Sequence, residues 1–271
     1  MLSRPRKRFG QHFLEPVWVD KVIRAIDPRP TDVFVEIGPG RGALTRPLAA
    51  RAKSVHAYEI DRDLARSLGA SAPPNVQVVQ GDFLETRDDR RPATDSIRVA
   101  GNLPYNVASP ILFKLIDWSA QGVPLVDATL MLQREVADRL TAKPGTRDYG
   151  ALTVLIGHRS TVQRLLALPP GAFRPAPKVR SALVRFVFHP AEPPVRDPAI
   201  FAAVVQAVFT RRRKTLENAL RAYAEASCNP REALNVANLD GTRRPETLTA
   251  AEFARLADAF AEGSDRDLIA T

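Results

Sequence analysis

The chain has 271 residues, of which 45% are hydrophobic and 25% charged, a composition that supports a folded core and excludes a wholly disordered chain. The single cysteine, Cys228, excludes an intramolecular disulfide and argues against a metal site built from cysteines, and no apolar run is long enough to span a membrane. The 39 Lys and Arg residues outnumber the 30 Asp and Glu residues, and the formal charge of +9 favours a polyanionic partner such as nucleic acid.

Basic residues gather at two places in the sequence. The segment from Arg4 to Arg8 holds four of them, and Arg211, Arg212, Arg213 and Lys214 form an unbroken run. The clustering favours a nucleic-acid surface over evenly spread charge that only aids solubility. No apolar segment follows the basic N-terminus, which argues against a secretory signal and, with the cysteine count, predicts a cytoplasmic protein.

From residue 32 onward the chain alternates short β-branched runs with amphipathic helical runs. The predicted strands are 32–38, 54–61, 75–82, 96–102, 126–133, 161–168 and 181–189, and the predicted helices between them are 43–52, 63–70, 107–118 and 134–142. Such alternation is typical of a doubly wound α/β sheet with mostly parallel strands.

A proline-rich segment, 189–198, separates this pattern from the rest of the chain. Beyond it, apolar residues recur only at helical spacing, within 200–209, 216–223 and 253–260. We therefore expect an α/β domain over residues 1–190 and a small all-helical domain over residues 191–271.

A glycine-rich turn, 36–42, closes the first predicted strand and opens a helix. Its glycines, including Gly38 and Gly40, would let a ligand approach the backbone, although a tight turn without a ligand has the same composition. The next three strands end at polar residues: Glu59, Asp82 and Asn102. In an open α/β sheet ligands bind beyond the carboxyl ends of the strands, so these groups should share one crevice. Because a pyrophosphate would need basic groups, the acidic lining favours S-adenosylmethionine over NAD.

The tetrapeptide Asn102-Leu103-Pro104-Tyr105 fits chemistry on an adenine amino group. The lone pair of that amine is delocalised, and two acceptors on its N–H bonds, the Asn102 side chain and the Leu103 carbonyl, would free it for methyl transfer. Pro104 fixes the turn, and Tyr105 offers a face for an unstacked base. On this basis Tyr105→Phe should keep most activity. An ordinary turn remains the alternative for the tetrapeptide by itself.

With these motifs in order, the chain resembles the ribosomal RNA adenine N6,N6-dimethyltransferases of the small subunit. The resemblance covers nearly the whole chain through KRFGQHFL (Lys7–Leu14), EIGPGRGALT, YEIDRDL, GDFL, NLPYN, FRPAPKVRSALVR (Phe173–Arg185) and FTRRRKTLENAL (Phe209–Leu220). It implies a Rossmann-like methyltransferase sheet. It also implies four methyl transfers, two to each of two adjacent adenosines in a hairpin of 16S rRNA, and a role in small-subunit biogenesis.

The resemblance also assigns site residues. Cofactor binding falls to Gln11, His12, Leu14, Gly38, Gly40, Glu59, Ile60, Asp82, Phe83 and Asn102; catalysis to Asn102, Leu103, Pro104, Tyr105 and Phe173; and RNA binding to Arg211, Arg212, Arg213 and Lys214. His12 stands where asparagine is common, and Glu217 where a basic residue is common.

Three other functions would account for part of these motifs. A large-subunit resistance methyltransferase shares several motifs but fits Leu103 and the basic run less well. A DNA adenine methyltransferase would usually carry proline in place of Leu103. A non-enzymatic assembly or transcription factor would not need the intact motifs. We expect immature 30S subunits as the partner, a monomer, no membrane and no metal, because the four histidines lack ligand spacing.

Overall fold

The computed structural model describes residues 12–86, 91–221, 223 and 229–269. Contacts divide the chain into a first unit, residues 1–137 with 160–188, and a second unit, residues 138–159 with 189–271. The division near residue 189 lies close to the boundary expected from the prolines. Residues 138–159, which the sequence analysis places in the first domain, group instead with the helical second unit.

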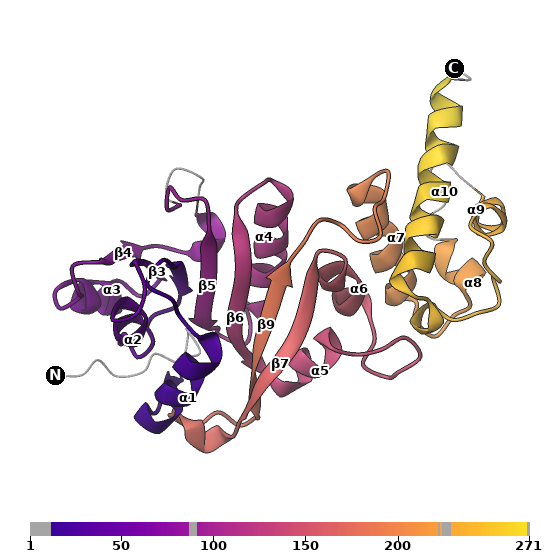
Figure 1. Cartoon of the computed structure of the whole chain (residues 1–271). Coiled ribbons are helices and arrows are strands. Elements are labelled where there is room, and N and C mark those ends of the chain that lie inside the picture. The colour runs from indigo at the N-terminus through magenta and orange to yellow at the C-terminus, as the bar shows by residue number, and fades with distance from the viewer. Residues whose placement is uncertain (1–11, 87–90, 222, 224–228, 270–271) are drawn as a thin grey trace. The chain divides into compact units, whose positions relative to one another are not determined.

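A seven-stranded sheet runs through the first unit in the order β4-β3-β2-β5-β6-β9-β7 (Figure 1). The strands are β2 (Val33–Ile37), β3 (Ser54–Glu59), β4 (Val76–Gln80), β5 (Ile97–Asn102), β6 (Leu125–Gln133), β7 (Ser160–Leu168) and β9 (Ser181–Phe188). From β4 to β6 the neighbours are parallel, and β9 is antiparallel to both β6 and β7. The predicted Rossmann-like α/β fold is confirmed, and each predicted strand lies within two residues of the observed one.

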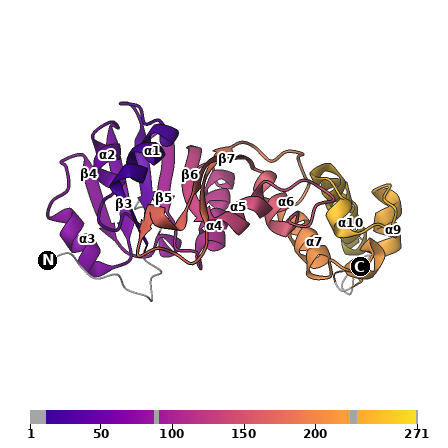
Figure 2. The ribbon, with the colours of Figure 1, turned by 90° about the horizontal axis from the view of Figure 1, so that it is seen from below.

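Helices cover both faces of this sheet (Figure 2). One face packs on α1 (Pro16–Ile26) and α2 (Thr45–Ala49) through a buried cluster that includes Ile23, Leu48 and Phe34. The other face carries α4 (Ala108–Ala120), where the rings of Trp118, Phe83 and Tyr58 meet edge to face. α3 (Arg62–Gly69) contacts β3 and β4.

The direction of winding changes at β2. The chain first builds outward through β3 and β4, and then returns to place β5 on the other side of β2. At this junction Gly101 is required, because a Cβ there would lie 2.7 Å from the Ile37 carbonyl oxygen. A crevice beyond the carboxyl ends of β2 and β5 is therefore the expected ligand site.

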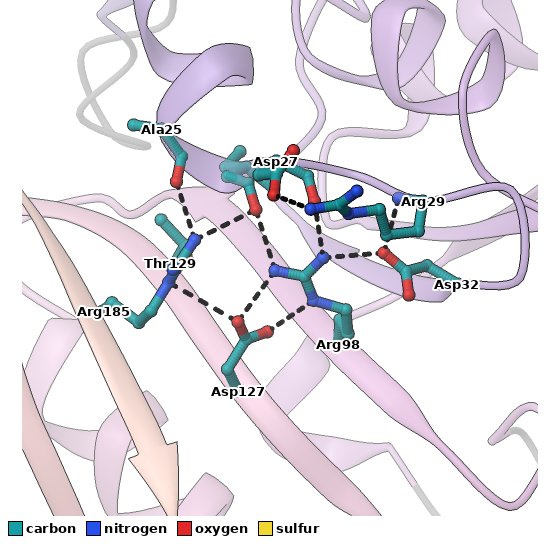
Figure 3. A network of polar contacts seen from close by, with 9 residues as sticks. Ala25, Asp27, Arg29, Asp32, Arg98, Asp127, Thr129 and Arg185 are labelled. Carbon is teal, nitrogen blue, oxygen red and sulfur yellow. Dashed lines mark hydrogen bonds and ion pairs between the residues drawn. The ribbon is translucent and has the colours of Figure 1, made fainter.

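A buried ionic network links the end of α1 to the end of the sheet that lies away from this crevice (Figure 3). Arg98 donates Nε and Nη2 to the two oxygens of Asp127 at 2.9 and 2.8 Å, and Nη1 to Asp32 at 2.7 Å. It also donates to the carbonyls of residues 26 and 27, where α1 ends, and Arg185 donates to the Ala25 carbonyl. Burial opposes the charge, yet the two carboxylates hold the pKa of Arg98 above its ordinary value.

The second unit is helical where it is described. It contains α6 (Ala151–Gly157), α7 (Pro198–Thr210), α8 (Leu216–Leu220), α9 (Pro230–Val236) and α10 (Ala250–Ile269), while α5 (Arg134–Leu140) crosses the division. Its core joins Val204 and Val208 of α7 to Leu216 and to Phe253 of α10. No helix among the described residues is long and apolar enough to cross a membrane.

Candidate active site

A pocket lies where β2, β3 and β5 end, at the point where the winding direction changes. It is lined by residues of three strand ends and of the segment before α1: His12, Phe13, Leu14, Glu36, Gly38, Pro39, Gly40, Ala43, Leu44, Glu59, Ile60, Asn102, Leu103, Pro104, Tyr105 and Met131. The structure thus brings most of the predicted cofactor residues and the whole predicted catalytic tetrapeptide to one place.

The glycine-rich turn and Glu59 form one wall of the pocket. Gly40 has φ +58°, and a Cβ there would lie 3.1 Å from the Phe13 ring, so a side chain would be strained and crowded. The amides of Gly40 and Asp61 each donate to a different oxygen of Glu59 at 2.9 Å. Both carboxylate oxygens are therefore held in place and retain a lone pair each for a hydroxyl donor. Burial raises the pKa of Glu59, and these amides oppose the rise.

A second acid in the pocket, Glu36, was not predicted as a site residue. Its side chain is 1% exposed, and none of the described residues donates a hydrogen bond to its Oε2. Burial raises the pKa of Glu36 to about 8, the nearby Thr45 hydroxyl opposes this, and the charge of Glu59 adds to it. The available sequence signal was a lone carboxylate in the otherwise apolar strand VFVEI.

Asn102 contacts the segment that precedes α1. Its Nδ2 donates to the His12 carbonyl oxygen at 2.6 Å. Because a carbonyl only accepts hydrogen bonds, this contact fixes which end of the amide is nitrogen. The same segment is held by pairing of β1 (Phe13–Leu14) with β8 (Phe173–Arg174), so residues about 160 apart in sequence meet beside the catalytic turn.

Tyr105 is held at its ring face and at its hydroxyl. The His12 ring stacks on it with centroids 5.8 Å apart and planes 26° from parallel. His12 is itself fixed, because its Nδ1 donates to the Pro175 carbonyl at 2.6 Å. The Tyr105 hydroxyl lies 2.7 Å from Oγ of Ser181, a buried residue that sequence reasoning did not select.

Other predicted residues lie outside this pocket lining. Asp82 follows β4, beside β3, and accepts from the Leu84 amide at 2.9 Å, while the ring of Phe83 is buried against Tyr58 and Trp118. Phe173 is 2% exposed and packed in the core, so contact with a base would require its ring to move. Gln11 lies outside the described residues. The cofactor-binding roles of Asp82 and Phe83 and the catalytic role of Phe173 stay predictions.

The basic run follows α7 in the second unit and divides into two kinds of residue. Arg211, Arg213 and Lys214 are exposed. Arg212 instead donates to the carbonyl oxygens of Arg147 at 2.6 Å and Thr146 at 3.1 Å, and so holds a loop of its own unit. Among the residues that the structure covers, no group of His, Cys, Asp or Glu could hold a metal ion.

Comparison with known proteins shows relatives along nearly the whole chain. The family model described as ribosomal RNA adenine dimethylase matches residues 2–262. A ribosomal RNA small subunit methyltransferase A from Aromatoleum aromaticum is 45% identical over 268 residues, covering 98% of this chain and 97% of the relative. One of the same name from Laribacter hongkongensis is 42% identical over 261 residues, covering 95% and 97%.

Solved structures with a similar fold include a dimethyladenosine transferase and an rRNA methyltransferase. A dimethyladenosine transferase from Plasmodium falciparum has a TM-score of 0.76 at 25% identity, covering 93% of this chain and 98% of the neighbour. The 23S rRNA methyltransferase ErmE has a TM-score of 0.65 at 28% identity, covering 92% and 99%.

Proposed function

The chain belongs to the ribosomal RNA adenine dimethylase family, and we propose that it dimethylates the N6 amino groups of two adjacent adenosines in a small-subunit rRNA hairpin. The observation that carries this proposal is the catalytic turn: Asn102 to Tyr105 lie at the edge of an acid-lined pocket at the point where the sheet reverses its winding. We further propose that the enzyme acts as a cytoplasmic monomer on immature 30S subunits, without a metal.

S-adenosylmethionine fits the pocket as the methyl donor. When bound, it supplies an activated methyl group on a cationic sulfonium. Glu59, with both oxygens prearranged by backbone amides, would accept the ribose hydroxyls. Glu36 offers a buried oxygen that no described residue pairs, and a cationic ligand would favour its ionised form. Two acids suit this cofactor better than a dinucleotide pyrophosphate, which would need basic groups.

The catalytic turn would act on the target amine. Because Nδ2 of Asn102 is used by the His12 carbonyl, Oδ1 is the end of the amide available to accept an amino N–H. The Leu103 carbonyl would accept the second N–H. Two acceptors on one amine favour a geometry in which its lone pair leaves conjugation with the ring. The face of Tyr105 would support the extruded base.

The second unit would bind rRNA phosphates. Arg212 holds the loop containing exposed Lys143 and Arg147 beside the end of α7, where Arg211, Arg213 and Lys214 are also exposed. Arg212 thus brings basic side chains of two chain segments together at the end of α7, which suits a polyanionic backbone.

One experiment separates this function from its rivals. The protein is incubated with labelled S-adenosylmethionine and, in parallel, with unmodified small subunits, large subunits or duplex DNA, and the modified base is mapped. We expect dimethyladenosine at two adjacent positions of small-subunit RNA only, and Asn102→Ala should abolish it. Label in large subunits or DNA, or none with any substrate, would overturn the proposal.

A further inference from the structure

Tyr105 follows β5 in the catalytic turn, while Ser181 begins β9, 76 residues further along the chain, and their hydroxyls lie 2.7 Å apart. Ser181 is 3% exposed, so neither water nor another conformation readily replaces this partner. The contact is therefore a specific link between the catalytic turn and the interior of the sheet.

The backbone of Ser181 is a rigid anchor. It pairs with Gln133 of β6 on one side and with Leu168 of β7 on the other. The preceding carbonyl, that of Arg180, accepts from the Arg134 amide at 2.9 Å. Cα and Cβ of Ser181 therefore cannot shift far without breaking sheet pairing on both sides, which leaves its hydroxyl only rotation about the Cα–Cβ bond.

We propose that Ser181 is a positioning residue for methyl transfer: its hydroxyl fixes the ring angle of Tyr105 so that the ring lies where the target adenine stacks. The inference rests on the proposed function and extends it. The stacked His12 ring restrains one face of Tyr105, but stacking alone permits sliding in the ring plane. The hydrogen bond at the distal end of the ring removes that freedom. Burial raises the pKa of the Tyr105 hydroxyl, so it stays neutral, and either hydroxyl can be the donor in this bond.

The proposal reverses the expectation that Tyr105→Phe is mild. Phenylalanine keeps the ring face but frees its angle and leaves a buried serine hydroxyl without its partner. Ser181→Ala should free the ring in the same way. Each substitution should slow single-turnover methylation roughly 2–10-fold, the rate equivalent of one hydrogen bond. Because both remove the same bond, the double variant should be about as slow as the slower single variant.

The test is a double-mutant cycle of Tyr105→Phe and Ser181→Ala, with unmodified small subunits and saturating S-adenosylmethionine. Calorimetric cofactor affinity should stay unchanged in Ser181→Ala, since Ser181 lies outside the pocket lining. Ser160→Ala is the matched control, because Ser160 is also buried and begins the adjacent strand β7. It should methylate at the wild-type rate.

Several outcomes would overturn the inference. Single-variant effects that multiply in the double variant would show that the two hydroxyls act independently, and an unimpaired Ser181→Ala would show that its hydroxyl does not matter. If Ser181→Ala fails to fold, Tyr105→Phe decides, and a wild-type rate refutes the proposal. A wild-type protein that leaves small subunits unmethylated would instead refute the proposed function.

Discussion

Replacement of Glu36 by glutamine should stabilise the ligand-free protein while weakening its cofactor site. Glu36 is 1% exposed, and burial raises its pKa from 4.5 in the unfolded chain to about 8. Because the folded-state pKa is the higher one, the contribution of Glu36 to the stability of the fold is fully present below pH 4.5. That contribution is lost as the pH rises through 8. At pH 7 folding must take up a proton, at a cost of about 3 kcal/mol.

Glutamine keeps the shape of the protonated acid and requires no proton uptake. Glu36→Gln should therefore be about 3 kcal/mol more stable than wild type at pH 7, which corresponds to a rise in Tm of roughly 6–12 °C, and equally stable near pH 4. Thermal melts across this range measure the difference. Glu85→Gln is the control, because Glu85 is exposed and its replacement should leave stability unchanged.

Binding of the cationic cofactor should reverse the preference. S-adenosylmethionine should select the ionised Glu36, so wild-type affinity should rise up to about tenfold per pH unit between pH 6 and 8 and level off above. This pH dependence of affinity should disappear in Glu36→Gln. Its loss would identify Glu36 rather than Glu59 as the group that titrates. Calorimetry in buffers of different ionisation enthalpy would detect the released proton. A variant no more stable than wild type at pH 7, with the pH slope of binding intact, would refute the reasoning.

Three further variants test other parts of the molecule. Glu59→Ala should weaken S-adenosylmethionine binding about 10–100-fold by calorimetry, through the loss of charge-assisted hydrogen bonds, and unchanged affinity would exclude the ribose assignment. Asp127→Ala should cost about 3–5 kcal/mol in denaturant unfolding, because it leaves Arg98 buried beside one fewer carboxylate; a loss below 1 kcal/mol would mean that the network contributes little. Arg213→Glu with Lys214→Glu should weaken RNA binding and flatten its salt dependence by about 0.7–0.9 per lost phosphate contact, with cofactor affinity as the control.

The sheet was predictable because each of its strands carries its own apolar pattern. The predicted strands also gave the positions of the strand ends, and Glu59, Asp82 and Asn102 were selected because they stand there. Helix α1 was missed although Val22, Ile23 and Ile26 recur at helical spacing after an N-terminal proline. The β1–β8 pair has no such signal, because two-residue strands show no periodicity and their partners are set by the folded sheet.

The sequence predicts which residues belong to the site better than it predicts which of them contact one another. The bonds from Asn102 to His12 and from Tyr105 to Ser181 join residues 90 and 76 positions apart, and nothing local in the sequence encodes them. Glu36 differs, since a carboxylate inside an apolar strand is itself a signal that its burial must serve a purpose or be compensated.

The basic run shows why charge patterning predicts a partner class but not the residues that contact it. Four consecutive cations look equivalent in sequence, yet α7 ends at Thr210, and the Lys214 amide donates to the Arg211 carbonyl in the turn that follows. That turn sends the Arg212 guanidinium to the carbonyls of Thr146 and Arg147. Replacing Arg212 would therefore release the loop that carries further basic side chains, and a loss of RNA affinity would mix local unfolding with lost charge. Only substitutions at the exposed members of the run isolate the phosphate contacts that a salt slope measures.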